Sequence, residues 1–553
     1  MSWKEISQIK LNEIQTKLSR KYEEASTITE QDKILADLSA EELHEELIRR
    51  KKIDSSSNGL VKAVCLFHAR QAEAKNSYLS LTNVLTDDAI RSAKELESKI
   101  TPANVNQYPL YGYILSIKDC IRVKGQICSA GLICGLHEYA FETPFIDYLH
   151  NKGAVTMSRG NVPQILLAME SNNNIFGSSS NPHNVLRSSG GSSGGDAALV
   201  ALGHVNAAIG SDIAGSLRIP AFFCGIYSMN ITSARIDPAA HAFPFEFHAE
   251  AKTLGDKQFA IPVTIGPLTK TLKDLNKFTE VIVNYHNENP RIPPVPWNHS
   301  PKKITKVGVI VEWDNVFELT KTNRRAYSMA IDALHKSGIQ TVEIDMRPYI
   351  LDLIQHVVCV HFKNERIYQA ISGKIDLGEP LVPQYANFAK MVKAPQLMIK
   401  LLETTTGDVK KRTYLRAFIN SRKYNMHWVV NRIQELKDRF MRQLAEAGVE
   451  VWITPGMMPA VIKNISKGCD IWAGYMMVWN AFKCCSGALP ITRVQNDEQS
   501  YESKFDFEFE ECIRATMKDS AGLPVGVQVV AGPWREESIL EVMKVIDDVT
   551  QYK

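Results

Sequence analysis

The chain has 553 residues, of which 44% are hydrophobic and 23% are charged, proportions typical of a soluble globular protein with a large core. Its 64 basic and 61 acidic side chains almost balance, leaving a formal net charge of +3. This balance gives no electrostatic indication of a nucleic-acid partner and does not suggest a membrane surface, although peripheral membrane association is left open.

The ten cysteines include no pair at the spacing of a zinc site. Most have apolar neighbours, which indicates small buried side chains in a reducing compartment. The N-terminal residues Met1–Glu5 are charged and lack the apolar segment of a signal peptide. Because no run of about 18 apolar residues occurs, no transmembrane segment is predicted. We expect a cytoplasmic protein.

In chain order, residues 1–105 are predicted to be helical, because Glu, Lys, Leu and Ala dominate and apolar residues recur every three or four positions. β-branched and aromatic residues then predict strands at Tyr111–Ile117 and Ala154–Met157. Residues 171–195 are rich in Asn, Ser and Gly. The Ala-rich stretch that follows, Ala197–Leu202, predicts a helix.

The second half follows a proline-rich connector at 286–303. Next come a strand, a helix and a strand that together predict a βαβ unit, at Val307–Val311, Arg324–Lys336 and Thr341–Ile344. Residues 350–450 are again predicted to be helical. The last predicted elements are three strands and a helix, at Val451–Thr454, Ala488–Thr492, Val525–Val530 and Glu536–Val549. This order predicts an α/β domain preceded by a helical segment.

The most unusual segment is Gly190–Asp196, in which four glycines surround Ser192 and Ser193. A flexible linker is one interpretation, but the segment leads directly into a predicted helix, whose first N–H groups favour negative charge. A phosphate-binding loop would need a lysine that is absent here. The G-x-S-x-G spacing around Ser192 also matches the nucleophile elbow of α/β hydrolases, although no strand is predicted before it.

Two further segments hold candidate catalytic residues. Ser216 lies in Gly210–Pro220, where small residues allow the backbone to approach a ligand closely. Lys118 directly follows the first predicted strand, and strand ends collect the chemistry of α/β folds. Taken singly, Lys118 is more often a solvated lysine and Ser216 a turn residue.

Together, the three segments resemble the amidase signature family. Its pattern G-G-S-S-G-G, followed after a spacer by G-[ST]-D-x-x-G-S-[IL]-R-x-P, is long and specific, and Ser192 and Ser216 hold its spacing. Other segments with family counterparts cover nearly the whole chain: Asn161–Gln164, Phe176–Gly177, Asn181–Pro182, Gly266–Leu268, Thr454–Pro455, Leu489–Pro490 and Gly522–Gln528. Within the family, the chain is most similar to fungal acetamidases and general amidases, and next to fatty acid amide hydrolases.

The resemblance implies one large domain over 106–553, with a mixed central β-sheet covered by helices, and a helical segment, 1–105, packed on it. It also implies a Ser-Ser-Lys triad without metal or organic cofactor. Ser216 would attack the amide, Ser192, in a cis peptide, would relay the proton, and Lys118 would accept it. Since lysine is a base only when neutral, Lys118 should be desolvated enough to lower its pKa.

The resemblance further implies supporting roles in the same loops. Backbone N–H groups of Ile213, Ala214, Gly215 and Ser216 would hold the oxyanion. Ser193 would orient its loop through its hydroxyl. The last two supporting residues, Asp212 and Arg218, would brace the nucleophile loop by pairing, with a plain surface ion pair as the alternative.

The chain departs from the family pattern at several positions. Ala214 replaces a usual glycine, Gly160 a common threonine and Asp196 a common glutamate. Ser228–Ile231 replaces Gly-Leu-Lys/Arg-Pro, and Tyr111–Tyr113 replaces Gly-[LIV]-Pro. If position 214 needs a positive φ, the Cβ of Ala214 costs about 1–2 kcal/mol.

The expected activity is hydrolysis of small or medium monocarboxamides to an acid and ammonia or an amine, with a small-molecule amide as the partner. The alternatives are a fatty acid amide hydrolase, a catalytically weakened amidase-fold protein, an α/β hydrolase with a histidine base, and a glutaminase subunit of an amidotransferase. A homodimer is left open. Candidate segments for the acyl pocket are 350–450 and 470–485, with buried core as the alternative interpretation of Tyr475, Met476, Met477 and Trp479.

Overall fold

The fold comes from a computed structural model. It describes residues 2–552 except 75–78, 138–143, 238–239, 242–260, 312–317, 349, 364–378, 383–384, 386–393 and 465–472. The two candidate pocket segments, 350–450 and 470–485, therefore lie partly outside the described residues.

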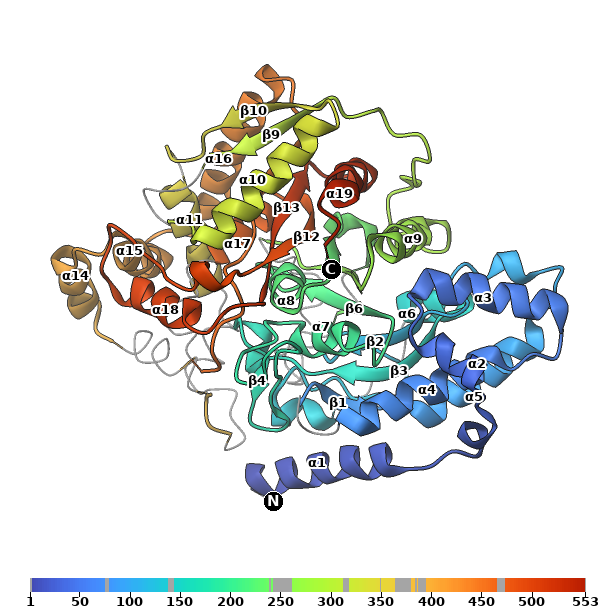
Figure 1. The fold of residues 1–553 in the computed structure, drawn as a ribbon. Coiled ribbons are helices and arrows are strands. Elements are labelled where there is room, and N and C mark those ends of the chain that lie inside the picture. Colours follow the sequence, from blue (N-terminus) through green and yellow to red (C-terminus); the bar gives the residue numbers. More distant parts are fainter. Residues whose placement is uncertain are drawn as a thin grey trace.

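An eleven-stranded sheet runs through the middle of the molecule (Figure 1). Its strands, in spatial order, are β1 (Leu81–Val84), β3 (Val155–Gly160), β2 (Ile114–Lys118), β6 (Ala207–Asp212), β8 (Thr264–Thr269), β7 (Tyr227–Asn230), β12 (Cys485–Arg493), β13 (Pro524–Ala531), β11 (Val451–Pro455), β9 (Lys306–Ile310) and β10 (Gln340–Ile344). Neighbours β3, β2 and β6 are parallel, as are β11, β9 and β10, whereas β6 to β11 pair antiparallel. The predicted α/β class with a mixed central sheet is confirmed.

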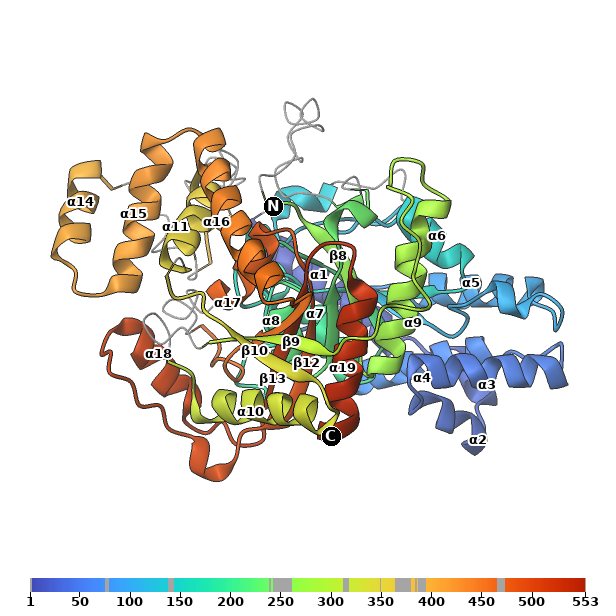
Figure 2. The same cartoon turned by 90° about the horizontal axis from the view of Figure 1, so that it is seen from above.

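The N-terminal segment forms a helical layer at one side of the molecule (Figures 1 and 2). Its helices are α1 (Trp3–Ser19), α2 (Glu30–Lys33), α3 (Ala40–Ile53), α4 (Gly59–Ala74) and α5 (Thr86–Lys99). Ser2, Thr29 and Ser39 each begin a helix with a capping box, in which side chain and backbone satisfy each other's donors. The segment is not purely helical, because β1 lies within it and pairs antiparallel with β3.

Parallel pairing in the first half positions the candidate residues. In β2, Leu115–Ile117 pair with Ala207–Ile209 of β6. Both strands are fully buried, which explains their apolar and small residues. Two helices follow the nearby loops, α7 (Gly194–Ala201) and α8 (Arg218–Cys224). The carboxyl ends of β2 and β6 therefore meet at one edge, beside both loops.

The second half confirms the βαβ unit: β9 and β10 are parallel, with α10 (Lys321–Lys336) between them in the chain. The helices α11 (Ile350–Lys363), α14 (Gln396–Thr405), α15 (Val409–Lys423) and α16 (Met426–Glu446) gather on the side of the molecule away from α3 and α4 (Figure 2). In the part of the chain that the structure describes, the other α-helices are α6 (Pro144–Asn151), α9 (Leu272–Val283), α17 (Gly474–Ala481), α18 (Glu508–Met517) and α19 (Glu536–Thr550). Of these, α19 packs on β12 and β13, as does α10.

Among the described residues, eight cysteines form no disulfide, and seven of these are buried. Cys512, in α18, is disulfide-bonded, which differs from the expectation of buried thiols in a reducing compartment. Among the described helices, none has both the length and the apolar content to cross a bilayer. Within the same residues, no cluster of three or more His, Cys, Asp or Glu side chains is arranged to hold a metal ion.

Candidate active site

Three chain segments meet beyond the carboxyl ends of β2 and β6. Lys118 is the last residue of β2, Ser192 lies just before α7, and Ser216 lies in the loop between β6 and α8. All three side chains are buried, with Ser216 the most accessible at 8% exposed. Residues far apart in the sequence are thus gathered by strand pairing and by two loops that each enter a helix.

The Lys118 amine has three close oxygen partners. Its Nζ lies 2.7 Å from Ser192 Oγ, 2.9 Å from Ser211 Oγ and 3.2 Å from the Ser211 carbonyl. Burial lowers the pKa of Lys118, against the opposing influence of Cys120, Asp196 and Asp212. The amine is thus in contact with a serine hydroxyl, in surroundings that lower its pKa.

The Gly191–Ser192 peptide bond is cis. A Cβ on Gly191 would lie 2.4 Å from the Ala168 carbonyl oxygen, so only glycine fits there. The neighbouring Ser193 joins this loop to the next: its N–H donates to the Ser216 carbonyl (3.1 Å) and its hydroxyl to the Ser211 carbonyl (3.3 Å). The two serine-bearing loops are therefore held together through backbone groups.

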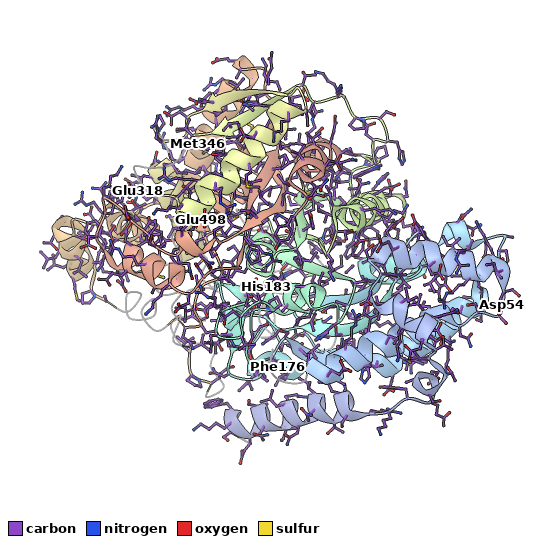
Figure 3. The ribbon with its side chains drawn as sticks, viewed as in Figure 1. Asp54, Phe176, His183, Glu318, Met346 and Glu498 are labelled. Atoms are coloured by element: carbon purple, nitrogen blue, oxygen red, sulfur yellow. The ribbon has the colours of Figure 1, made fainter. Side chains whose placement is uncertain are left out.

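The hydroxyls of Ser192 and Ser216 form no hydrogen bond with each other among the described residues. The structure thus brings Lys118 and Ser192 into direct contact and leaves the second step of the expected relay open. No strand leads directly into the Ser192 loop, which follows isolated bridges at Arg187 and Ser188. This geometry disfavours a nucleophile elbow at Ser192. The nucleophile-elbow alternative would also need a histidine base, but Nε2 of His183 (Figure 3) pairs with the Cys224 carbonyl at 2.9 Å.

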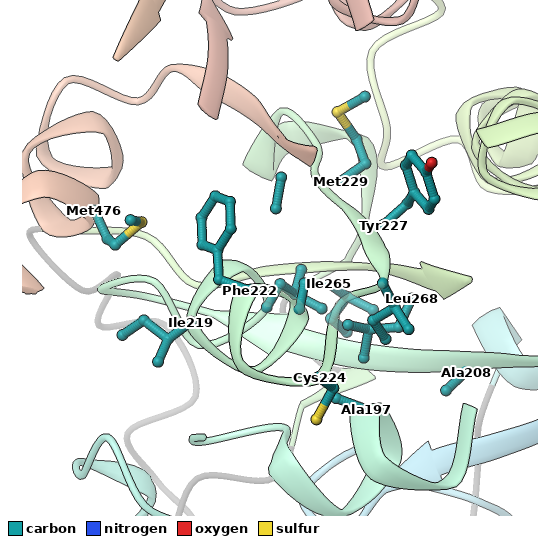
Figure 4. Packing of buried hydrophobic residues seen from close by; sticks show 14 of the residues in the cluster. Ala197, Ala208, Ile219, Phe222, Cys224, Tyr227, Met229, Ile265, Leu268 and Met476 are labelled. Carbon is teal, nitrogen blue, oxygen red and sulfur yellow. The ribbon is translucent and has the colours of Figure 1, made fainter. Parts of the chain in front are cut away.

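The loop from Ile213 to Ser216 turns sharply at Gly215, which has φ +112°. A Cβ there would lie 2.6 Å from the Met476 Cβ and 3.1 Å from Ile219 Cδ1. Figure 4 shows these two side chains, of α17 and α8. Ala214 does not belong to the described non-glycine residues with positive φ, so its Cβ brings no such strain. The Gly215 N–H donates to Asp212 Oδ1 (2.7 Å) and does not face the nucleophile.

Asp212 and Arg218 form a fully buried ion pair at 3.1 Å, not a surface pair. Burial alone would raise the pKa of Asp212, but the charge and hydrogen bonds of Arg218 lower it. Arg218 also donates to the Asn480 side chain, to the Met476 carbonyl (3.1 Å) and to Gln528 Oε1 (3.0 Å). The pair therefore ties the nucleophile loop to α17 and β13.

Two departures from the family pattern are explained by one contact. A Cβ on Gly160 would lie 2.3 Å from the carboxyl carbon of Asp196, so the shorter side chain and the glycine accommodate each other. Asp196 Oδ1 accepts a hydrogen bond from Ser116 Oγ at 2.6 Å. Burial raises the pKa of Asp196 to about 7.

The structure adds neighbours of Lys118 that sequence analysis missed. Ser211 lies inside the same motif as Ser216, so the sequence could have indicated it as a site residue. His241 carries no motif; its Nε2 lies 3.1 Å from Ser211 Oγ and 3.2 Å from Cys120 Sγ. Burial and the nearby charges of Lys118 and Arg122 lower the pKa of His241 well below its usual value.

The α17 residues proposed for an acyl pocket are buried. Trp479 packs on Trp452 with ring centroids 5.6 Å apart and on Phe440 at 5.7 Å, so it belongs to the core. Met476 lies against Gly215 in the nucleophile loop. Met476 therefore contacts the candidate site.

Comparison with known proteins identifies the relatives of this chain. A family model described as Amidase matches residues 62–540. An amidase of Gibberella zeae is 27% identical over 90% of this chain and 88% of its own length. Acetamidase of Emericella nidulans is 26% identical, covering 87% and 84%, and fatty-acid amide hydrolase 1 of Sus scrofa is 26% identical, covering 79% and 75%.

Solved structures share the fold. A fatty acid amide hydrolase superposes with a TM-score of 0.77 at 19% identity, covering 99% of this chain and 94% of that one. A bacterial aryl acylamidase of the amidase signature family superposes with a TM-score of 0.64 at 16% identity, covering 93% and 96%. The same fold therefore extends over nearly the whole chain.

Proposed function

Because this chain belongs to the amidase signature family, we propose that it hydrolyses small or medium aliphatic or aromatic monocarboxamides to an acid and ammonia or an amine. The observation that carries the proposal is the contact between the buried Lys118 amine and the Ser192 hydroxyl, at 2.7 Å. A desolvated lysine beside a hydroxyl supplies the base that a serine nucleophile requires.

In the proposed reaction, Ser216 Oγ forms a bond to the amide carbon as its proton passes to Ser192, whose own proton passes to Lys118. The C–N bond then breaks, and the leaving amine takes a proton back through Ser192. Water attacks the acyl-enzyme by the same relay and releases the acid. The step between Ser192 and Ser216 requires their hydroxyls to meet when substrate binds.

The oxyanion would be held by backbone N–H groups of Ile213, Ala214 and Ser216, since the Gly215 N–H already donates to Asp212. Losing one such donor typically lowers the rate about 10²–10³-fold. Ser193 would keep the two loops in register, and the Asp212–Arg218 pair would hold the turn.

The test is a substrate panel of acetamide, benzamide and longer acyl amides, with released ammonia measured for the parent, Ser216→Ala and Lys118→Ala. Turnover by the parent alone supports the proposal. Pure folded protein that turns over no amide would remove it. Labelling of Ser216 by a fluorophosphonate probe would separate an active enzyme from a weakened, binding-only relative.

A fatty acid amide hydrolase is the second candidate, since enzymes of that name are similar in sequence over most of the chain. The two candidates differ in the acyl chain they accept. A series of primary amides from two to eighteen carbons distinguishes them: kcat/KM that rises steadily with chain length favours the second candidate, and a maximum at short chains favours the first.

A further inference from the structure

His241 lies close to the proposed base without touching either serine of the triad. It is 4% exposed and pairs in an isolated bridge with Ile121, three residues beyond Lys118. Its Nε2 lies 3.1 Å from Ser211 Oγ, and that hydroxyl lies 2.9 Å from Lys118 Nζ. A continuous hydrogen-bonded chain therefore runs from His241 through Ser211 to Lys118 and on to Ser192.

Which group donates in each of these hydrogen bonds matters if Lys118 is neutral. A neutral amine has two N–H donors and one lone pair, and only the lone pair can take a proton. If the lone pair faces Ser192, the two N–H groups must donate to the Ser211 carbonyl and the Ser211 hydroxyl. The Ser211 hydroxyl must then accept from Lys118 and donate its own proton elsewhere.

His241 Nε2 is the acceptor placed to receive that proton. The opposite orientation, with Ser211 donating to Lys118, would occupy the lone pair and block the base. After proton transfer, the resulting ammonium has three N–H donors for its three oxygen partners, and the Ser211 hydroxyl still accepts. One orientation of Ser211 thus serves both charge states of Lys118.

We infer that His241 is a positioning residue, which holds the Ser211 hydroxyl as an acceptor so that the lone pair of Lys118 points at Ser192. This role rests on the proposed function and assigns His241 no contact with substrate.

Cys120 competes only weakly for the same acceptor. Its Sγ lies 3.2 Å from His241 Nε2 and 3.6 Å from Ser211 Oγ. A thiol is a weaker donor than a hydroxyl. Burial raises the pKa of Cys120 to about 11, so it remains a thiol near neutral pH.

The experiment compares His241→Leu and His241→Gln with the parent, measuring kcat and KM for an amide that the parent hydrolyses. A glutamine oxygen reaches the place of Nε2 and still accepts, whereas leucine cannot. We expect His241→Leu to lower kcat about tenfold to a hundredfold, within the contribution of a positioned base. KM should be unchanged, fluorophosphonate labelling of Ser216 should slow in parallel, and His241→Gln should stay within about threefold of the parent.

A double-mutant cycle tests whether His241 acts through Ser211. Adding His241→Leu to Ser211→Ala should cause no further loss, because the hydroxyl it orients is already gone. His68→Leu is the matched control, since His68 is equally buried and pairs with the Thr86 hydroxyl at 2.7 Å, away from the site. It should leave kcat at the parental value.

Losses that multiply in the double variant, or a glutamine variant as slow as the leucine one, would overturn the inference. If His241→Leu does not fold, His241→Asn replaces it, because its shorter amide cannot reach Ser211 Oγ. A parent that hydrolyses amides beside a fully active His241→Leu would refute this inference alone. A parent that neither hydrolyses amides nor labels would refute the proposed function as well.

Discussion

At Lys118, burial and nearby charges act on the pKa of one amine in opposite directions. Removal from water favours the neutral form, while the nearby Asp196, Asp212 and Cys120 favour the charged form. The burial effect is the larger, so the pKa falls. The same three oxygen atoms hydrogen-bond to Lys118 in both charge states, the neutral base and the ammonium that forms after proton transfer.

This balance predicts how activity depends on pH. Because the neutral amine is the active form, kcat/KM should rise as pH rises through the pKa of Lys118 and then level off. The plateau should begin below the pH at which an exposed lysine loses its proton. A pH–rate profile of the parent measures this limb, with Lys118→Ala as the control. Activity that is highest in acid would contradict a neutral lysine base.

The raised pKa of Asp196 predicts that the stability of the folded protein also depends on pH. Its pKa is raised from 3.8 to about 7 in the folded protein, so the folded state holds a proton that the unfolded state has released. Its contribution is complete below the unfolded pKa and is lost as pH rises toward 7, by up to about 1.4 kcal/mol for each pH unit between the two values.

Asp196→Asn should remove this part of the dependence, because asparagine stays neutral. Unfolding by denaturant at a series of pH values between 4 and 8 measures it. The parent should lose more stability with rising pH than Asp196→Asn does. Parallel curves for the two proteins would show that Asp196 is ionised throughout.

At the scale of elements, the loop between β6 and α8 requires a residue without a side chain at one position, Gly215. The φ of +112° and the Met476 contact both exclude a side chain at this residue. The preceding residue carries a Cβ without penalty, although the family pattern has glycine there. Glycine at 214 is thus not required by this backbone.

We therefore predict opposite outcomes for two matched substitutions. Gly215→Ala should destabilise the protein by about 1–2 kcal/mol from its φ, with about 1–3 kcal/mol more from overlap with Met476, and should lower kcat sharply. Ala214→Gly should change kcat by less than about threefold. Melting temperature and kcat of both variants provide the test. Equal losses would mean that the turn tolerates a side chain at 215.

At the scale of the whole molecule, the buried Asp212–Arg218 pair joins the nucleophile loop to the C-terminal half. Arg218 reaches α17 through Asn480 and β13 through Gln528, residues more than 250 positions away. Removing one partner leaves the other charge buried and unpaired, which is strongly destabilising. The nucleophile loop and the C-terminal strands should therefore unfold together.

Arg218→Ala should lower the free energy of unfolding by about 3–5 kcal/mol. The control is Arg347→Ala, which breaks an exposed pair with Asp345 at 2.9 Å and should cost no more than about 1 kcal/mol. Denaturant unfolding measures both. Similar small losses would show that the buried network contributes little to stability.

Local features of the sequence determined much of this architecture. Apolar periodicity predicted the N-terminal helices, and the βαβ unit at β9–α10–β10 followed from the order of its segments. The helices α6, α8, α9 and α18 were not predicted. The family and its three motif segments were recognisable because each loop has local backbone demands, such as glycine at 191 and 215. β1, β6, β7 and β8 were not predicted. β1 is an edge strand of four residues inside a helical segment, which has too little pattern to stand out.

The contacts around Lys118 were decided by tertiary structure alone. Ser211 meets Lys118 because β2 and β6 are paired in parallel, and His241 reaches Ser211 from a segment with no motif. The fit of Gly160 to Asp196 likewise depends on how β3 and α7 pack. A sequence motif reflects the backbone conformation of a single loop. These contacts instead depend on the order of strands in the sheet, which cannot be read from any single segment.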